Sequence, residues 1–177
     1  STYFWRNIEI EDIRLALQTF IPSSTQTPGR LNLFQFKQFQ FLVDFAHNPA
    51  GLELLCDFVS KLEGEPKVGI ISGTGDRRDE DIKEQGKISG RSFDEIIIRQ
   101  DKNLRGRTAE EIVNLLVEGI NETKTKDIPV TIILNEKEAI MHAYNTAKPG
   151  SLITIMCDVV AEALDLIKGL KEKEDLE

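Results

Sequence analysis

The sequence predicts an α/β fold in which a mostly parallel six-stranded sheet carries helices on both faces and begins with an antiparallel hairpin. Short apolar runs alternate with amphipathic helical stretches from residue 50 onward, and this alternation is typical of a parallel sheet covered by helices. Two apolar runs near the start are separated by only two residues. The length of 177 residues suits one well-packed domain. Together these observations indicate a Rossmann-like architecture.

The hairpin strands are expected at residues 31–36 and 39–45, joined by Lys37 and Gln38. In the second strand Phe41 and Val43 alternate with Leu42 and Asp44, so Asp44 should point away from the aromatic face. A carboxylate at the end of a core strand needs a partner. A turn or helix-capping acid is the alternative interpretation.

The remaining elements follow in alternation, each bounded by turn residues. Strands are expected at 67–72, 94–99, 130–134 and 151–156, and helices at 50–62, 79–90, 109–120, 137–147 and 159–170. Thr108 and Glu111 form a predicted capping box before the helix at 109. The helix at 79 is poor in apolar residues, and its small side chains are expected to let it lie close on the sheet.

An amphipathic helix is expected at 9–20, where Pro22 ends the pattern, and a polar segment at 23–29 indicates a boundary. We therefore expect residues 1–22 to form a linker helix, residues 23–170 the domain, and residues 171–177 a solvated tail.

The composition excludes several functions. A formal net charge of −8 and a pI near 4.9 argue against a nucleic-acid partner. No apolar stretch approaches the roughly 20 residues that cross a membrane, and no signal peptide is evident. Cys56 and Cys157 occur singly in apolar surroundings, which is typical of buried thiols in the cytoplasm. Neither the cysteines nor the histidines have metal-ligand spacing, so no metal site is expected here.

Ligands of open α/β sheets bind where the strands end, which directs attention to the loops there. The first, 44–49, brings Asp44, His47 and Asn48 within five residues, and these groups suit a nucleobase and ribose. Asn48 could equally cap the next helix, and His47 could be a lone histidine.

The second loop, 72–79, is rich in glycine but precedes an acidic helix start that would repel a phosphate. Its glycines are therefore expected to admit a neutral part of a ligand, with Asp76 near ribose hydroxyls or a cation. For Arg77 and Arg78, surface ion pairs with Asp79 and Glu80 are the alternative. No Gly-x-x-x-x-Gly-Lys-Ser/Thr motif occurs.

A third loop, 99–107, is long and charged, which is typical of a functional loop at a strand end, and a solvated turn is the alternative.

Three segments of the sequence resemble, in order and spacing, the C-terminal domain of Mur ligases: 28–30 (Pro-Gly-Arg), 44–51 (Asp-Phe-Ala-His-Asn-Pro-Ala-Gly) and 75–82 (Gly-Asp-Arg-Arg-Asp-Glu-Asp-Ile). Within that superfamily, the acidic run after Gly75 and the Leu-Arg-Gly-Arg of 104–107 are most similar to cyanophycin synthetases.

The resemblance implies an ATP-dependent ligase that joins a carboxylate to an amine through an acyl phosphate, here arginine to polyaspartate. It implies that this lobe closes over ATP, while the P-loop and most Mg²⁺ contacts belong to a preceding central ATPase domain, of which residues 1–22 are the end. Arg30, Asp44, His47, Asn48 and Asp76 would contact the nucleotide. The amine would lie near a second set: Arg77, Arg78, Asp101, Arg105 and Arg107.

The isolated lobe would then be inactive, and assembly into a homo-oligomer is compatible with the resemblance. Phe45 replaces a common tyrosine, and 101–103 is less acidic than in cyanophycin synthetases, which leaves another amine open. A nucleotide-binding regulatory module acting alone, or a structural domain, are alternative functions.

Overall fold

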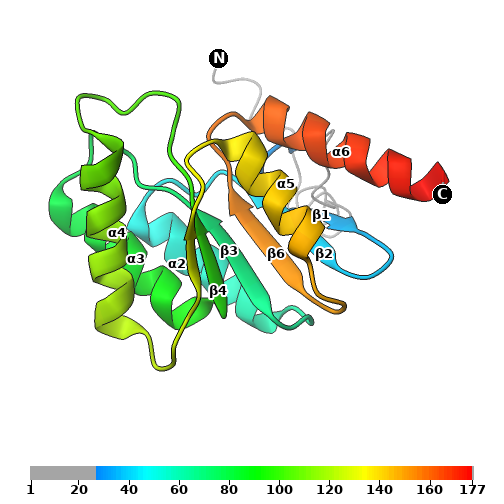
Figure 1. Cartoon of the computed structure of the whole chain (residues 1–177), viewed down its shortest axis with the longest axis horizontal. Coiled ribbons are helices and arrows are strands. Elements are labelled where there is room, and N and C mark those ends of the chain that lie inside the picture. The colour runs from blue at the N-terminus through cyan, green and yellow to red at the C-terminus, as the bar shows by residue number, and fades with distance from the viewer. Residues whose placement is uncertain (1–26, 177) are drawn as a thin grey trace, which may run out of the picture.

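The computed structural model describes residues 27–176, which form one six-stranded sheet with helices on both faces (Figure 1). The strands are β1 (Asn32–Gln35), β2 (Gln40–Asp44), β3 (Lys67–Ile71), β4 (Glu95–Ile98), β5 (Val130–Ile132) and β6 (Leu152–Met156). The helices are α2 (Pro49–Lys61), α3 (Asp79–Ser92), α4 (Ala109–Thr123), α5 (Glu136–Thr146) and α6 (Val160–Leu176). The predicted fold class is confirmed, whereas the helix expected at 9–20 and the boundary at 22 lie outside the described residues.

The strand order is β1-β2-β6-β3-β4-β5, with the β1–β2 pair antiparallel and every other pair parallel. The predicted two-residue hairpin is confirmed, because Gln35 pairs with Gln40 and the Phe36 amide donates to the Phe39 carbonyl at 2.9 Å. β6 lies between β2 and β3, and all five of its residues are buried. Such a continuous apolar strand is typical of the centre of a parallel sheet.

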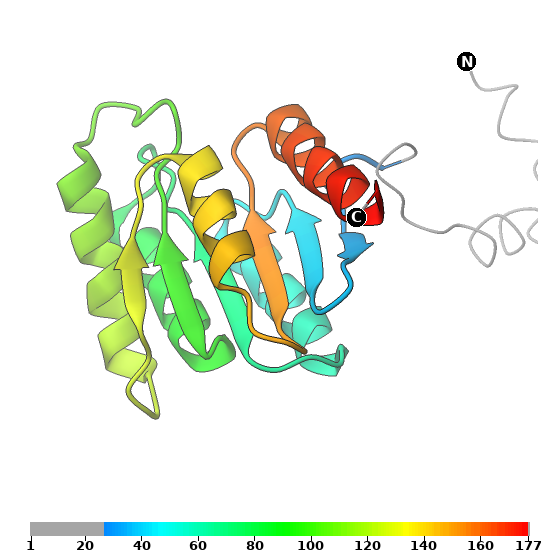
Figure 2. The same ribbon diagram turned by 45° about the vertical axis from the view of Figure 1, so that its right-hand side comes forward.

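Two hydrophobic cores lie on opposite faces of the sheet. One packs α2, α3 and α4 against one face, and the other packs α5 and α6 against the second face. Figure 2 shows α5 and α6 on the near side of the sheet and α2 and α3 behind it. Alternation along β2 divides its side chains between the cores, since Leu42 joins the first and Phe41 and Val43 the second. This is the alternation that the sequence predicted.

The small residues of α3 serve a different contact from the predicted one. A Cβ atom added to Gly86 would lie 2.3 Å from the Leu116 carbonyl oxygen, and one added to Gly119 would lie 2.0 Å from the Lys83 carbonyl oxygen. The glycines therefore let α3 approach α4, and the prediction that they bring α3 onto the sheet was wrong. Close approach to the sheet occurs at Gly69, where the Phe93 ring takes the place of a side chain.

The last helix is longer than predicted, because α6 continues past Leu170 to Leu176. Two contacts support the extra turns: Lys171 forms an ion pair with Asp175 at 2.5 Å, and the Lys37 amide in the hairpin donates to Glu174 Oε2 at 2.9 Å. The tail thus remains mostly exposed but helical.

Across residues 27–176, every helix is too short or too polar to cross a lipid bilayer.

Candidate nucleotide and substrate site

The end of β2 and the loop after it are held in place by hydrogen bonds that their side chains accept from backbone amides. Asp44 Oδ2 accepts the Leu31 amide at 3.0 Å, which ties the end of β2 to the segment before β1. Asn48 caps α2, since its Oδ1 accepts the Gly51 amide at 2.8 Å. The predicted capping role of Asn48 is therefore confirmed, and it fixes where α2 begins.

Two cationic or aromatic side chains lie against the Phe45 ring. The Arg30 guanidinium carbon lies 5.7 Å from its centroid, and the His47 ring centroid lies 5.0 Å from it at an interplanar angle of 44°. His47 Nδ1 is also 3.0 Å from the Phe45 carbonyl oxygen, which restrains the exposed imidazole. Phe45 thus contacts both groups and brings them close to the same ring.

These side chains line a common pocket of about 230 Å³. Four of the five predicted nucleotide residues, Arg30, Asp44, His47 and Asn48, belong to its wall. Part of the wall is apolar and exposed, since Leu54 is 73% exposed and lies in the same pocket. The volume falls below the roughly 300–1,000 Å³ of complete small-molecule sites. The pocket is therefore sized for part of a ligand.

Burial dominates the electrostatics of this pocket at Asp44. Desolvation raises the pKa of its carboxyl group, although the Leu31 amide and the positive charge of Arg30 oppose the shift. Asp44 is only 7% exposed, and its backbone carbonyl accepts the Cys157 amide at 2.9 Å. Its side chain is thus a buried acceptor held at the end of the strand next to β6.

The glycine turn after β3 packs against the chain itself. A Cβ atom on Gly75 would lie 2.0 Å from the Leu104 carbonyl oxygen, and one on Gly73 would lie 2.8 Å from Ile112 Cγ2. The expectation that these glycines admit a ligand was wrong, because the approaching atoms belong to the loop after β4 and to α4.

Arginines of the loop after β4 clamp this turn. Arg107 donates to the carbonyl oxygens of Gly75 and Arg77, both at 2.9 Å, and pairs with Asp79 at 2.6 Å. Arg105 pairs with Asp76 at 2.5 Å, which lowers the pKa of that exposed carboxyl group. Asp76 therefore joins the predicted substrate residues and lies apart from the predicted nucleotide residues.

The other predicted substrate residues do not all join that clamp. Arg78 forms an exposed ion pair with Asp81 at 2.9 Å, so its predicted surface pairing is right in kind, but Asp79 and Glu80 are not its partners. Asp101 is 8% exposed and accepts the Ser72 hydroxyl at 3.0 Å. The burial of Asp101 therefore contradicts the alternative interpretation of residues 99–107 as a purely solvated turn.

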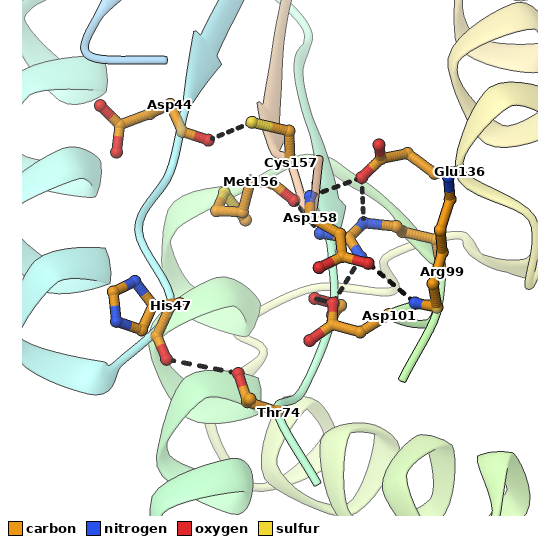
Figure 3. A network of polar contacts seen from close by, with 11 residues as sticks. Asp44, His47, Thr74, Arg99, Asp101, Glu136, Met156, Cys157 and Asp158 are labelled. Atoms are coloured by element: carbon orange, nitrogen blue, oxygen red, sulfur yellow. Dashed lines mark hydrogen bonds and ion pairs between the residues drawn. The ribbon is translucent and has the colours of Figure 1, made fainter. Parts of the chain in front are cut away.

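Arg99, to which the sequence pattern gave no separate role, organises a buried network at the ends of β4 and β6 (Figure 3). Its side chain is 1% exposed and pairs with Asp101 at 2.6 Å and Glu136 at 3.2 Å. It also donates to the Met156 carbonyl. Glu136 Oε2 in turn accepts the Asp158 amide at 2.7 Å. The signal in the sequence that could have identified Arg99 is a charged residue directly after the three isoleucines of β4.

Among residues 27–176, no group of three or more His, Cys, Asp or Glu side chains is arranged to hold a metal ion.

Comparisons with known proteins agree with this geometry. The family model described as "Mur ligase, glutamate ligase domain" matches residues 29–158. The chain is 42% identical over 164 residues to the cyanophycin synthetase of Crocosphaera subtropica and 40% identical over 173 residues to that of Nostoc sp.. These alignments cover 93% and 97% of the chain, but in each case only 19% of the relative's length.

Solved structures share the fold. A bifunctional folylpolyglutamate synthase/dihydrofolate synthase with Mn, AMPPNP and L-glutamate bound superimposes with a TM-score of 0.68 at 19% identity, covering 94% of this chain and 37% of that one. The family match spans all three loops that carry the predicted site residues. The chain therefore belongs to the Mur ligase family, as its C-terminal, glutamate ligase domain, and is similar to cyanophycin synthetases over nearly its whole length.

Proposed function

We propose that this chain is the C-terminal lobe of an ATP-dependent amide ligase of the cyanophycin synthetase type, which closes over ATP and helps to bind the amine. The observation that carries the proposal is the grouping of Arg30, Asp44, His47 and Asn48 around one small pocket at the carboxyl edge of the sheet. A preceding central domain of the same protein would complete that pocket, which explains its small volume.

Each pocket group suits one part of the nucleotide. Arg30 would reach the phosphates, because its guanidinium is the group that binds them best. Asp44 would accept a ribose hydroxyl, and the His47 ring and Asn48 amide would flank the base. ATP supplies the phosphoryl group that activates the carboxylate as an acyl phosphate, and Mg²⁺ would be held mainly by the central domain. The nucleotide bound to the folylpolyglutamate synthase supports this choice of ligand.

For the reaction we propose addition of arginine to a polyaspartate acceptor, because the most similar relatives reported above are cyanophycin synthetases. The clamp of Asp76, Arg77, Arg105 and Arg107, with Asp101 beneath it, would position the amine. The three arginines of this clamp would favour the carboxylate of an amino acid over its cationic end. A Mur-type lobe with another amine specificity is the alternative.

The nucleotide assignment is tested with His47→Ala in the full-length protein, with His142→Ala on α5 as the matched control. We expect His47→Ala to raise the KM for ATP at least tenfold and His142→Ala to leave it unchanged. Equal kinetics for both variants, together with an Arg30→Ala variant that ligates normally, would favour a structural domain instead.

The ligase lobe and the stand-alone regulatory module differ in the affinity for ATP that they predict for this chain alone. Titration of ATP into the 177-residue chain should give only weak binding, with a Kd in the millimolar range, because half the site is missing. Micromolar or tighter binding to this chain alone would favour the regulatory module over the ligase lobe.

A further inference from the structure

The segment that carries Arg30 to the wall of the 230 Å³ pocket is a closed turn. The Arg30 amide donates to the Thr27 carbonyl oxygen at 3.1 Å, and between these residues lie Pro28 and Gly29, whose φ is 72°. Proline at the second position and a glycine with positive φ at the third are typical of a type II turn. The backbone of residues 27–30 is therefore a defined turn shortly before β1.

The side chain of Asn32 binds this turn at both ends. Its Oδ1 accepts the Gly29 amide at 2.7 Å, and its Nδ2 donates to the carbonyl oxygens of Thr27 at 3.0 Å and Arg30 at 3.1 Å. Asn32 is 2% exposed, so these hydrogen bonds replace those that water would otherwise make. The buried carboxamide thus uses its oxygen and its amino group on the residues around Arg30.

Two neighbouring contacts fix the rest of this segment. The Leu31 backbone is left-handed, with a φ of 50°, which costs free energy in a residue other than glycine, and its amide donates to Asp44 Oδ2 at 3.0 Å. Gly29 is buried against the start of α6, where an added Cβ atom would lie 2.6 Å from Val160 Cγ2. The amides of Gly29, Arg30 and Leu31 therefore all donate to acceptors of the lobe itself.

The Arg30 side chain is less restrained than its backbone. Its guanidinium carbon lies 5.7 Å from the centroid of the Phe45 ring, and it forms no ion pair with a carboxylate among residues 27–176. When the backbone is already ordered, binding of an anion has to order only the side chain, which lowers the entropic cost of binding. The turn thus presents a cation at the pocket in advance of the ligand.

We propose that Asn32 is a positioning residue for Arg30. Asn32 does not line the pocket, but it stabilises the turn from which Arg30 would reach the phosphates of ATP. A displacement of about 1 Å in a group that positions a substrate can slow a reaction about 100-fold, so a residue that touches no substrate can still be visible in the kinetics. The proposal rests on the proposed contact between Arg30 and ATP, whereas the hydrogen bonds to the turn do not.

The role is tested with Asn32→Ala in the full-length protein, with Ser151→Ala as the matched control. Ser151 is 1% exposed and stabilises a different turn before β6, at the amino edge of the sheet, where its hydroxyl donates to the Lys148 carbonyl oxygen at 2.8 Å. We expect Asn32→Ala to lower kcat/KM for ATP about tenfold or more and to leave the KM for the amine within about twofold. Ser151→Ala should change neither value, and urea denaturation verifies that both variants are folded.

Two further variants separate positioning from a general loss of structure. Asn32→Asp keeps the shape of the side chain but loses both N–H donors, so it should lower kcat/KM for ATP in the same direction. In an Arg30→Ala background, Asn32→Ala should cause no further loss, because both changes remove the same contact. Losses that multiply in the double variant, or unchanged kinetics of Asn32→Ala and Asn32→Asp, would overturn the role of Asn32.

Hydrogen exchange in the 177-residue chain measures the hydrogen bonds to the turn without any ATP. We expect the Gly29 amide to exchange about tenfold faster or more in Asn32→Ala than in the parent chain, and an unchanged rate would refute the effect of Asn32 on the turn. If Arg30→Ala leaves kcat/KM for ATP unchanged, the proposed contact with ATP fails, and the positioning role fails with it. If Arg30→Ala lowers this value but Asn32→Ala does not, the proposed function stands and the positioning role alone fails.

Discussion

Single residues at the carboxyl edge of the sheet carry charge into the interior, and Arg99 is the most buried of them. Its guanidinium meets Asp101, Glu136 and the Met156 carbonyl, so three segments distant in sequence share one cation. An intact buried ion pair adds little net stability. Removing only one partner, however, leaves the opposite charge buried without compensation. Arg99 thus joins the loop after β4, the start of α5 and the end of β6.

Replacing Arg99 with methionine should therefore be costly. Arg99→Met would leave Asp101 and Glu136 buried without their cation, and we expect it to lower the free energy of unfolding by about 3–5 kcal/mol. Arg91→Met is the control, because Arg91 and its partner Glu53 are 40% and 56% exposed and such pairs contribute about 0–1 kcal/mol. Urea denaturation measures both, and equal losses in the two variants would refute the role of Arg99.

Asp44 illustrates a residue whose burial opposes its charge. Its pKa is raised above the ordinary 3.8, so between 3.8 and the raised value the folded chain binds more protons than the unfolded chain. The free energy of unfolding must therefore fall as the pH rises through that window, and the loss from Asp44 is complete above it.

Asp44→Asn should remove this loss while keeping an oxygen that accepts the Leu31 amide. We expect the variant to be at least as stable as the parent at pH 7, with a flatter pH dependence above 3.8, yet impaired in ligation when placed in the full-length protein. Denaturation at several pH values and steady-state rates check the two halves. Parallel losses of stability and activity would assign Asp44 a structural role only.

At the scale of helices and strands, periodicity predicted most of the fold, and long-range contacts explain the exceptions. The alternation of Phe41, Leu42 and Val43 is local information, and it placed these side chains in the right cores. The partner of Gly86 is Leu116 on another helix, which no local pattern reveals. The candidate pocket was predictable where its residues follow one strand, as Asp44 to Asn48 do. The role of Arg99 was not predictable, because two of its partners, Glu136 and the Met156 carbonyl, come from distant elements.

The packing of α3 against α4 should be especially sensitive to the addition of a single methyl group. Gly119→Ala would place Cβ 2.0 Å from the Lys83 carbonyl oxygen, so the helices must separate, and we expect a cost of about 2 kcal/mol. Gly169→Ala on α6 is the control, since no atom lies within 4 Å of its added Cβ, and it should gain up to about 1 kcal/mol from helix propensity. Thermal unfolding measures both, and a stable Gly119→Ala variant would contradict the close packing.

At the scale of the whole molecule, one sheet joins two cores and presents the candidate nucleotide pocket at its carboxyl edge. β6 has buried residues in each core, so loss of packing on either face removes support from the other. A domain built in this way should unfold as one unit. The two cysteines report the faces separately, because Cys56 lies in the core of α2–α4 and Cys157 in that of α5 and α6.

Both thiols are protected in the folded chain. Desolvation raises the pKa of Cys56 to about 11 and that of Cys157 to about 12, and the side chains are 7% and 3% exposed. We therefore expect Cys56→Ala and Cys157→Ala, each leaving one thiol, to react with a disulfide reagent at pH 8 only as urea unfolds them. The two variants should show urea midpoints for thiol exposure that coincide with their own loss of helical signal. A thiol that reacts well before the helical signal falls would mean that one face of the sheet opens independently of the other.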